Sequence, residues 1–189
     1  MGFHTFDPAK AAKLDDEGRY QFCSREELLG AFAAGNGADD HLVDLGSGTG
    51  FYTAALAPFF GQVSAVDIQS EMHDHFRENG VPTNVSLVES STDNLPLDDG
   101  SVDAVLSTMT AHELPLAATL AELRRVLGTD GRFVIVDWSA EGQGEAGPPR
   151  SERLSAADLR ESLTETGFNV DRAEERGETL LIAATWDDR

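Results

Sequence analysis

Short apolar runs alternate along this chain with longer stretches in which apolar residues recur every three or four positions. The runs predict strands at residues 41–45, 62–67, 84–89, 102–107, 132–138, 168–174 and 179–186. The periodic stretches predict helices at residues 51–60, 70–80, 116–127 and 155–166, the third closed by Gly128 and the last capped by Ser155. Residues 7–33 also read as helical, in two pieces broken near Gly18, and Ser24 followed by Glu27 is a capping-box pattern.

The order of these elements indicates the fold class. Alternating short strands and helices are typical of an α/β protein whose parallel sheet carries helices on both faces. Only a short turn separates the last two strands, so the final strand should run antiparallel to the others. We therefore expect a seven-stranded, mostly parallel sheet in a single compact unit, with residues 1–37 as an N-terminal helical cap and residues 38–189 as the main domain.

Charge excludes two classes of partner. The 189 residues include 34 acids and 14 bases, a formal net charge of -20. Such a surface repels phosphate backbones and anionic lipids, so we expect no nucleic-acid and no membrane partner. Only Lys10 and Lys13 are lysines, and this scarcity together with the excess of acids resembles proteins adapted to high salt. A halophilic protein of this charge should lose stability when salt is diluted, because screening of like charges is lost.

The remaining composition favours a cytoplasmic protein. A single cysteine, Cys23, allows neither an internal disulfide nor a cysteine cluster for zinc. We see no apolar core of a secretory signal near the start of the sequence and no run of about 18 apolar residues. His73 and His75 lie two positions apart on a predicted helix, so they should point to different faces, and we expect both at the surface and no metal site.

The candidate chemistry lies in the segment 43–50, Val-Asp-Leu-Gly-Ser-Gly-Thr-Gly. Its glycines allow a sharp turn and close approach of a ligand to the main chain. Asp67 ends the next strand, where an acid can accept hydrogen bonds from ribose hydroxyls. A dinucleotide normally requires Gly-x-Gly-x-x-Gly, whereas here Asp44 precedes a Gly-x-Gly-x-Gly turn and would face a cationic group. This spacing favours S-adenosylmethionine over a nicotinamide cofactor.

With these residues in place, the chain over residues 38–186 resembles the class I S-adenosylmethionine-dependent methyltransferases, which have a Rossmann-like fold. It is most similar to small members related to ubiquinone/menaquinone C-methyltransferases and arsenite methyltransferases. Segment 43–50 matches the family's first motif and 65–72 the second, while 94–103 and 124–132 match the stretches before strands four and five. Arsenite enzymes need several thiols, so a single cysteine argues against that substrate.

The resemblance implies roles for individual residues. Asp44 would lie near the cofactor's amino group, Asp67 would hold its ribose, and Ile68 and Met72 would pack on adenine. At Ser91 the family usually has an acid that contacts the adenine amino group, so Ser91, Asp93 or water would have to replace it. The full set implied to bind the cofactor is Asp44, Gly46, Ser47, Gly48, Gly50, Asp67, Ile68, Met72, Ser91, Thr92, Ser107 and Met109.

The acceptor of the methyl group is not encoded in a recognisable motif. His112, in the loop after the fourth strand, is either a catalytic base or a histidine that orients the loop. Tyr20, His112 and Trp138 are candidates for the acceptor pocket. We expect a methyltransferase for a small molecule, active as a monomer or homodimer, and the acidic surface makes a cationic acceptor easier to accommodate than an anionic one. The alternatives are a non-catalytic cofactor-binding or scaffold protein and, less favoured by the glycine spacing, a dehydrogenase.

Overall fold

The computed structural model describes residues 6–32, 37 and 39–187. Its α-helices are α1 (Arg25–Phe32), α2 (Phe51–Leu56), α3 (Ser70–Asn79), α4 (Leu116–Val126) and α5 (Ala156–Glu165). Its 3-10 helices are η1 (Pro8–Asp15), η2 (Glu17–Gln21), η3 (Ala57–Phe59), η4 (Ala111–Glu113) and η5 (Arg150–Glu152). Its strands are β1 (His41–Leu45), β2 (Gln62–Asp67), β3 (Val85–Glu89), β4 (Val102–Thr108), β5 (Leu127–Trp138), β6 (Asn169–Glu175) and β7 (Thr179–Trp186).

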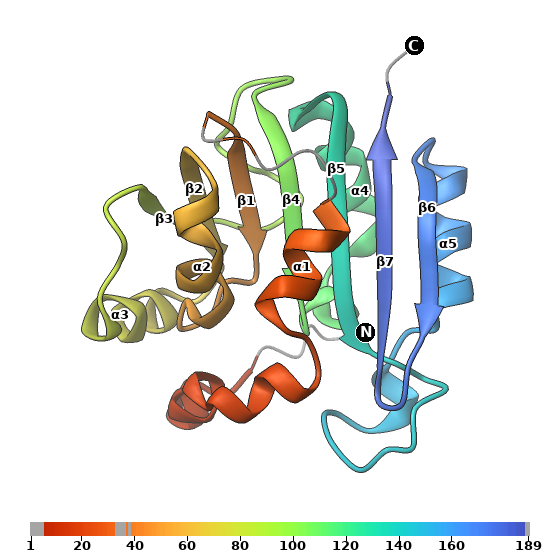
Figure 1. The fold of residues 1–189 in the computed structure, drawn as a ribbon, viewed down its shortest axis with the longest axis horizontal. Helices are drawn as coiled ribbons and strands as arrows, with labels where there is room; N and C mark the ends of the chain where they lie inside the picture. Colours follow the sequence, from red (N-terminus) through yellow and green to blue (C-terminus); the bar gives the residue numbers. More distant parts are fainter. Residues whose placement is uncertain (1–5, 33–36, 38, 188–189) are drawn as a thin grey trace.

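Across the described residues, seven strands form one sheet in the order β3-β2-β1-β4-β5-β7-β6 (Figure 1). The pairs from β3 to β5 are parallel, and β7 pairs antiparallel with both β5 and β6. The predicted Rossmann-like sheet with an antiparallel last strand is therefore confirmed. The strand order reverses at β1, where β1 lies between β2 and β4, and ligands bind beside such a switch point in open α/β sheets.

Helices cover both faces of the sheet, and strand alternation assigns the core residues to each face (Figure 1). On one face, Leu42 and Leu106 pack with helices α1 and α2. On the other, Val43 and Val105 pack with helices α4 and α5. The central strands β1 and β4 are buried on both sides, so they read as continuous apolar runs in the sequence rather than as an alternating pattern.

Several predicted element bounds are wrong for identifiable reasons. The predicted helical stretch 7–33 forms three elements rather than two pieces broken near Gly18: η1 and η2 meet at Asp16, whose side chain accepts from the Gly18 amide at 2.8 Å and caps η2, and α1 follows. Strand β5 begins at Leu127, directly after α4, so Gly128 belongs to the strand and does not close the helix. His73 is only 2% exposed rather than at the surface. The caps at Ser24 and Ser155 are confirmed, since their hydroxyls accept from the amides three residues on.

The N-terminal segment runs across the carboxyl end of the sheet, at the lower edge in Figure 1. The hydroxyl of Tyr52 holds this segment by donating to the carbonyls of Arg19 and Cys23 at 3.2 and 3.1 Å. The side-chain amide of Gln69 donates to the Phe6 carbonyl at 3.1 Å, which fixes the start of the segment over β2. Within residues 6–32, 37 and 39–187, no helix is long and apolar enough to span a bilayer.

Candidate functional site

A cavity of about 820 Å³ lies at the carboxyl ends of the parallel strands. Its floor is formed by the segments that follow β1, β2, β3 and β4, and its cover is formed by η1 and the start of η2. Its lining includes eleven of the candidate site residues of the sequence analysis, which are Gly46, Ser47, Gly48, Asp67, Ile68, Met72, Ser91, Thr92, Met109, His112 and Trp138. The topology thus gathers residues from five strand ends around one space of a size that suits a small-molecule ligand.

The glycine turn has left-handed backbone at three positions, with φ values of 70° at Gly46, 55° at Gly48 and 83° at Gly50. A Cβ at Gly46 would lie 2.2 Å from the side chain of Thr110, and a Cβ at Gly50 would lie 2.3 Å from the ring of Phe76. Both positions therefore require glycine for conformation and for space. Gly46 and Gly48 line the cavity, whereas Gly50 faces α3 and acts in packing.

Asp44 lies beneath the glycine turn and is 1% exposed. Its Oδ2 accepts a hydrogen bond from the hydroxyl of Thr53 at 2.5 Å, while its Oδ1 has no hydrogen-bond partner among the described residues. Burial raises the pKa of Asp44 to about 6, and nearby Asp67 raises it further, against the opposing effects of Thr53 and Arg19. Asp44 does not line the cavity, so a ligand group would reach it through the turn or through water.

Asp67 lines the cavity at the end of β2. Its Oδ2 accepts from the Gly48 amide at 2.8 Å, and its Oδ1 accepts from the Gln69 amide at 2.9 Å. These two bonds fix the carboxylate against the glycine turn and leave further lone pairs on both oxygens for a ligand. Asp67 can therefore accept from a pair of hydroxyl groups in the cavity.

One wall of the cavity is apolar at its base and polar above. Met72 is 1% exposed, whereas Ile68 is 59% exposed and offers a broad apolar surface to a ligand. The hydroxyl of Ser91 donates to the carboxylate of Asp93, and both residues line the cavity. Ser91, which occupies the position where the family usually has an acid, therefore hydrogen-bonds to an acid two residues further on, Asp93. Thr92 also lines the cavity, and its hydroxyl shares a 2.7 Å hydrogen bond with that of Thr119.

The loop after β4 also lines the cavity. Ser107 is fully buried and does not line the cavity, and its hydroxyl has no partner among the described residues. Met109 adopts a left-handed backbone with φ of 56° and lines the cavity. His112 follows on η4, and its Nδ1 lies 2.8 Å from Oδ1 of Asp137 at the end of β5. Trp138, the next residue, lines the cavity and packs edge-on against Phe22, with ring centroids 4.9 Å apart.

Three cationic residues of the N-terminal segment, Lys10, Lys13 and Arg19, line the cavity and were not among the predicted site residues. Lys10 and Lys13 are the only lysines of the chain, and they lie three positions apart on η1, where residues i and i+3 share one face. The guanidinium of Arg19 donates to the Leu14 carbonyl at 2.7 Å and stacks over the rings of Phe51 and Tyr52. Burial lowers the pKa of Arg19. The i, i+3 spacing of Lys10 and Lys13 could be seen in the sequence, but that this face covers the cavity could not.

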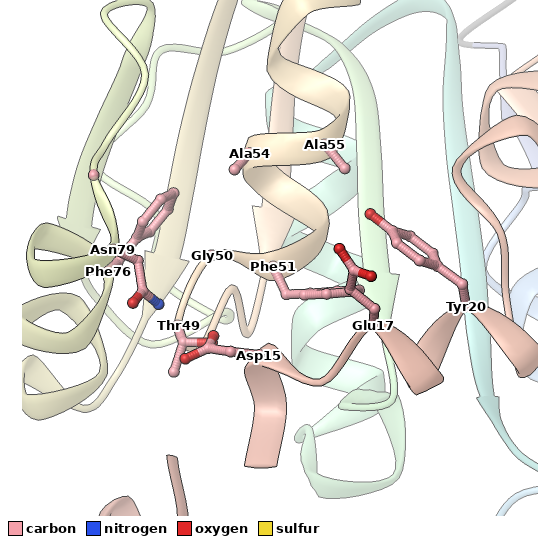
Figure 2. A pocket seen from close by; sticks show the side chains of 11 residues that line it. Asp15, Glu17, Tyr20, Thr49, Gly50, Phe51, Ala54, Ala55, Phe76 and Asn79 are labelled. Atoms are coloured by element: carbon pink, nitrogen blue, oxygen red, sulfur yellow. The ribbon is translucent and has the colours of Figure 1, made fainter. Parts of the chain in front are cut away.

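Tyr20 does not line this cavity. It lines a second, smaller hollow of about 380 Å³ beside the glycine turn, where its ring lies 4.8 Å from that of Phe51. Figure 2 shows Glu17 and Tyr20 on one side of this hollow and Phe76 and Asn79 of α3 on the other. The geometry therefore gives no support to Tyr20 as part of the acceptor pocket, whereas His112 and Trp138 share the main cavity.

The site can be compared with known proteins. A family model described as "Methyltransferase domain" matches residues 43–135, which run from the glycine turn through most of β5. An uncharacterised methyltransferase of Mycobacterium tuberculosis is 38% identical over 54% of this chain and 41% of its own length. The chain thus spans about two fifths of the length of such curated relatives.

Solved structures extend the similarity to nearly the whole chain. A SAM-dependent methyltransferase from Aquifex aeolicus is 32% identical, with a TM-score of 0.84, over 96% of this chain and 99% of that one. A Haloferax volcanii methyltransferase solved with the Trm112 methyltransferase activator is 23% identical, with a TM-score of 0.79, over 97% of this chain and 100% of that one. The second likeness concerns the fold alone.

Proposed function

The chain belongs to the S-adenosylmethionine-dependent methyltransferases, and from that premise we propose that it transfers a methyl group to a small-molecule acceptor. S-adenosylmethionine is its cofactor. One observation carries the proposal: nine of the twelve cofactor residues expected from the sequence, all but Asp44, Gly50 and Ser107, line the same cavity as the candidate base His112. A binding site and a reactive side chain in one enclosure are what a transferase needs.

The residues present fit this cofactor. Asp44 Oδ1 and the hydroxyl of Ser47 lie at the glycine turn without a hydrogen-bond partner in the described part of the chain, and they can accept from an ammonium group directly or through water. Asp67 would hold the ribose hydroxyls. Ile68 would cover the adenine ring, with the Ser91–Asp93 pair available to its exocyclic amine. Bound in this way, the cofactor supplies an electrophilic methyl group on a positively charged sulfur.

The chain's own residues have three tasks in such a reaction. The glycine turn and Asp67 would bind and orient the cofactor, since backbone hydrogen bonds fix both of them before a ligand arrives. Met109, Trp138 and the N-terminal segment exclude water, because they enclose the space above the turn. His112 is placed to take a proton from an acceptor at the loop wall. We propose that residues 1–37 form a cap that completes the acceptor pocket.

The competing proposal is a protein that binds S-adenosylmethionine without catalysis. Ser91 favours this alternative, because it stands where the family usually has an acid that contacts adenine. The hydrogen bond between Ser91 and the carboxylate of Asp93 weakens that argument, since it brings an acid to the same place. Two measurements separate the proposals. Calorimetry should show saturable binding of S-adenosylmethionine and S-adenosylhomocysteine, and incubation with methyl-labelled cofactor and a small-molecule extract should give a labelled product. Binding without any labelled product would favour the scaffold, and no binding would contradict both.

A further inference from the structure

The most completely bonded acid of the cavity region is Asp137, which is fully buried at the end of β5. Its Oδ2 accepts from the backbone amide of His112 at 2.8 Å. Its Oδ1 faces Nδ1 of His112 at 2.8 Å and accepts from the Trp138 amide at 2.7 Å. The carboxylate therefore holds both the backbone and the ring of His112, and its own position is fixed by the strand. The hydrogen bond from the His112 backbone amide would be enough to anchor the loop, so the second contact, to the imidazole ring, points to a role for the ring itself.

The geometry determines which ring nitrogen can act on a ligand. A carboxylate only accepts, so Nδ1 of His112 is the donor and the neutral ring has its lone pair on Nε2. His112 lines the cavity, and its Nδ1 is bound to Asp137, so Nε2 is the nitrogen left for the cavity. On that side, Oε1 of Glu113 lies 3.9 Å from Nε2.

The electrostatics increase the basicity of His112. Burial alone would lower the pKa of His112, but the hydrogen bond and charge of Asp137 raise it, as do the charges of Glu113 and of Glu152 on η5. The net result is a pKa above the usual value for histidine. An imidazole held by a buried carboxylate in this way is a general base whose protonated form is stabilised.

We propose that Asp137 is a positioning residue that makes His112 the base of this site, and that the methyl acceptor is a hydroxyl compound such as a phenol, enol or alcohol. The inference rests on the proposed methyltransferase function. A carboxylate acceptor needs no base, and a thiol is acidic enough near neutral pH to need little help. A weakly acidic hydroxyl is the acceptor that gains most from such a base.

The charges of the lining separate a hydroxyl from another protic acceptor, an ammonium. Lys10, Lys13 and Arg19 line the cavity. Of its carboxylates, Asp67 and Asp93 lie at the expected adenosine side, which leaves Glu113 next to His112. An ammonium acceptor would add a cation to a cavity that already holds three cationic side chains and would hold a sulfonium, whereas a hydroxyl that loses its proton becomes an anion there. The lining thus argues against the cationic acceptor that net charge suggested.

The reaction balances without another reagent. The acceptor O–H bond breaks and its proton goes to Nε2 of His112, whose positive charge Asp137 stabilises. The oxygen electron pair forms the new bond to the methyl carbon, and the sulfur keeps the pair of the broken S–C bond. The proton then leaves His112 for solvent, so the products are the methyl ether, S-adenosylhomocysteine and one proton.

Two measurements test the proposal. In the first, histidine NMR of the S-adenosylhomocysteine-loaded protein follows the titration and tautomer of His112 in wild type and in Asp137→Asn. We expect wild type to carry the proton on Nδ1 and to titrate above pH 6.5, and the variant to titrate at lower pH. The matched control is Asp103→Asn, since Asp103 binds the His41 amide at the opposite end of the sheet. An unchanged His112 titration in Asp137→Asn would overturn the positioning role.

In the second, the protein is incubated with trideuteromethyl cofactor and an extract of the source cell's small molecules, and the labelled product is identified. A methyl group on oxygen supports the proposal, and one on nitrogen or sulfur overturns the hydroxyl class. With that product's precursor, Asp137→Asn should lower kcat about 100-fold or more near pH 7 and shift the pH profile to lower pH, with cofactor affinity retained. If no product forms although the cofactor binds, methyl transfer itself fails, and the NMR result still decides the role of Asp137.

Discussion

Thr53 donates a 2.5 Å hydrogen bond to one oxygen of Asp44 and leaves the other oxygen without a partner in the described part of the chain. Asp44 is thus a buried acid that is half satisfied, and burial raises its pKa to about 6. Such an arrangement costs stability in the free protein and is resolved when a cation binds. The relation between these two residues leads to the first prediction.

Asp44→Asn should stabilise the ligand-free protein and weaken cofactor binding. Because the folded pKa of Asp44 lies above the ordinary value near 4, the folded state binds the extra proton, and stability falls as pH rises from about 4 through 6. In the variant the free energy of unfolding should no longer fall over this pH range, and above pH 6 it should exceed that of the wild type by on the order of 2 kcal/mol. Thermal unfolding at pH 4 and pH 7.5 checks this, and an equal effect at both values would contradict it. Calorimetry should show weaker S-adenosylmethionine binding.

Asp67→Ala should lower the affinity for S-adenosylhomocysteine about 100-fold, since the carboxylate that would accept hydrogen bonds from two ribose hydroxyls is lost, together with the acceptor of the Gly48 amide. An analogue without the 2′ and 3′ hydroxyls should bind wild type weakly and lose little more in the variant. Calorimetry with both ligands and both proteins forms a double-mutant-type cycle. Equal losses for the two ligands would show that Asp67 acts only through the turn.

Gly50→Ala should destabilise the fold by about 2–5 kcal/mol, because its φ of 83° is strained for alanine and its Cβ would lie 2.3 Å from the Phe76 ring. Two glycines provide matched controls. At Gly80, φ is 95° with nothing within 4 Å of a Cβ, so alanine there should cost only the backbone strain. At Gly30 in α1, a Cβ meets nothing within 4 Å, and alanine should be neutral or stabilising by up to about 1 kcal/mol. The denaturant midpoints of the three alanine variants rank their stabilities. Equal losses at Gly50 and Gly80 would contradict the proposal that Gly50 is needed for packing against Phe76.

Salt should stabilise this protein. With a formal net charge of -20, repulsion opposes the compact state in dilute buffer, and about 1 M salt shortens the screening length to about 3 Å. We expect the melting temperature at pH 7.5 to rise by at least about 5 °C between 0.1 and 2 M KCl. At pH 4.5, where many carboxylates take up protons, the rise should shrink. A melting temperature independent of KCl at pH 7.5 would remove the proposed adaptation to salt.

The fold was readable from local pattern, and parts of the site were not. Residues 43–50 predict the turn because glycines and an acid at this spacing are typical of few other structures. Ser155 predicts a helix start because its hydroxyl can accept from a backbone amide of the first helical turn, here that of Asp158. Asp137 was missed because it ends an apolar strand and its role depends on a partner 25 residues away. A charged residue closing an otherwise apolar run, at 133–138, was the available signal.

The N-terminal segment shows the same limit. Tyr20 was expected at the acceptor pocket from its aromatic character, but contacts with Phe51 and Tyr52 turn it to the second hollow. Arg19, its neighbour, lines the main cavity instead. Which of two adjacent side chains faces a cavity depends on the path of a 3-10 segment, and composition does not reveal this path. The roles of the individual site residues, the boundary near residue 37 and the cytoplasmic location stay predictions.

Both lysines of the chain line one cavity, and this makes the site addressable by amine chemistry. An amine-selective reagent has only Lys10, Lys13 and the chain's α-amino group to modify. Peptide mass spectrometry of the modified protein would therefore report almost exclusively on the cover of the cavity. A bound ligand that shields the lysines would appear as reduced labelling in a single peptide, so an acceptor could be screened for without knowing the reaction it undergoes.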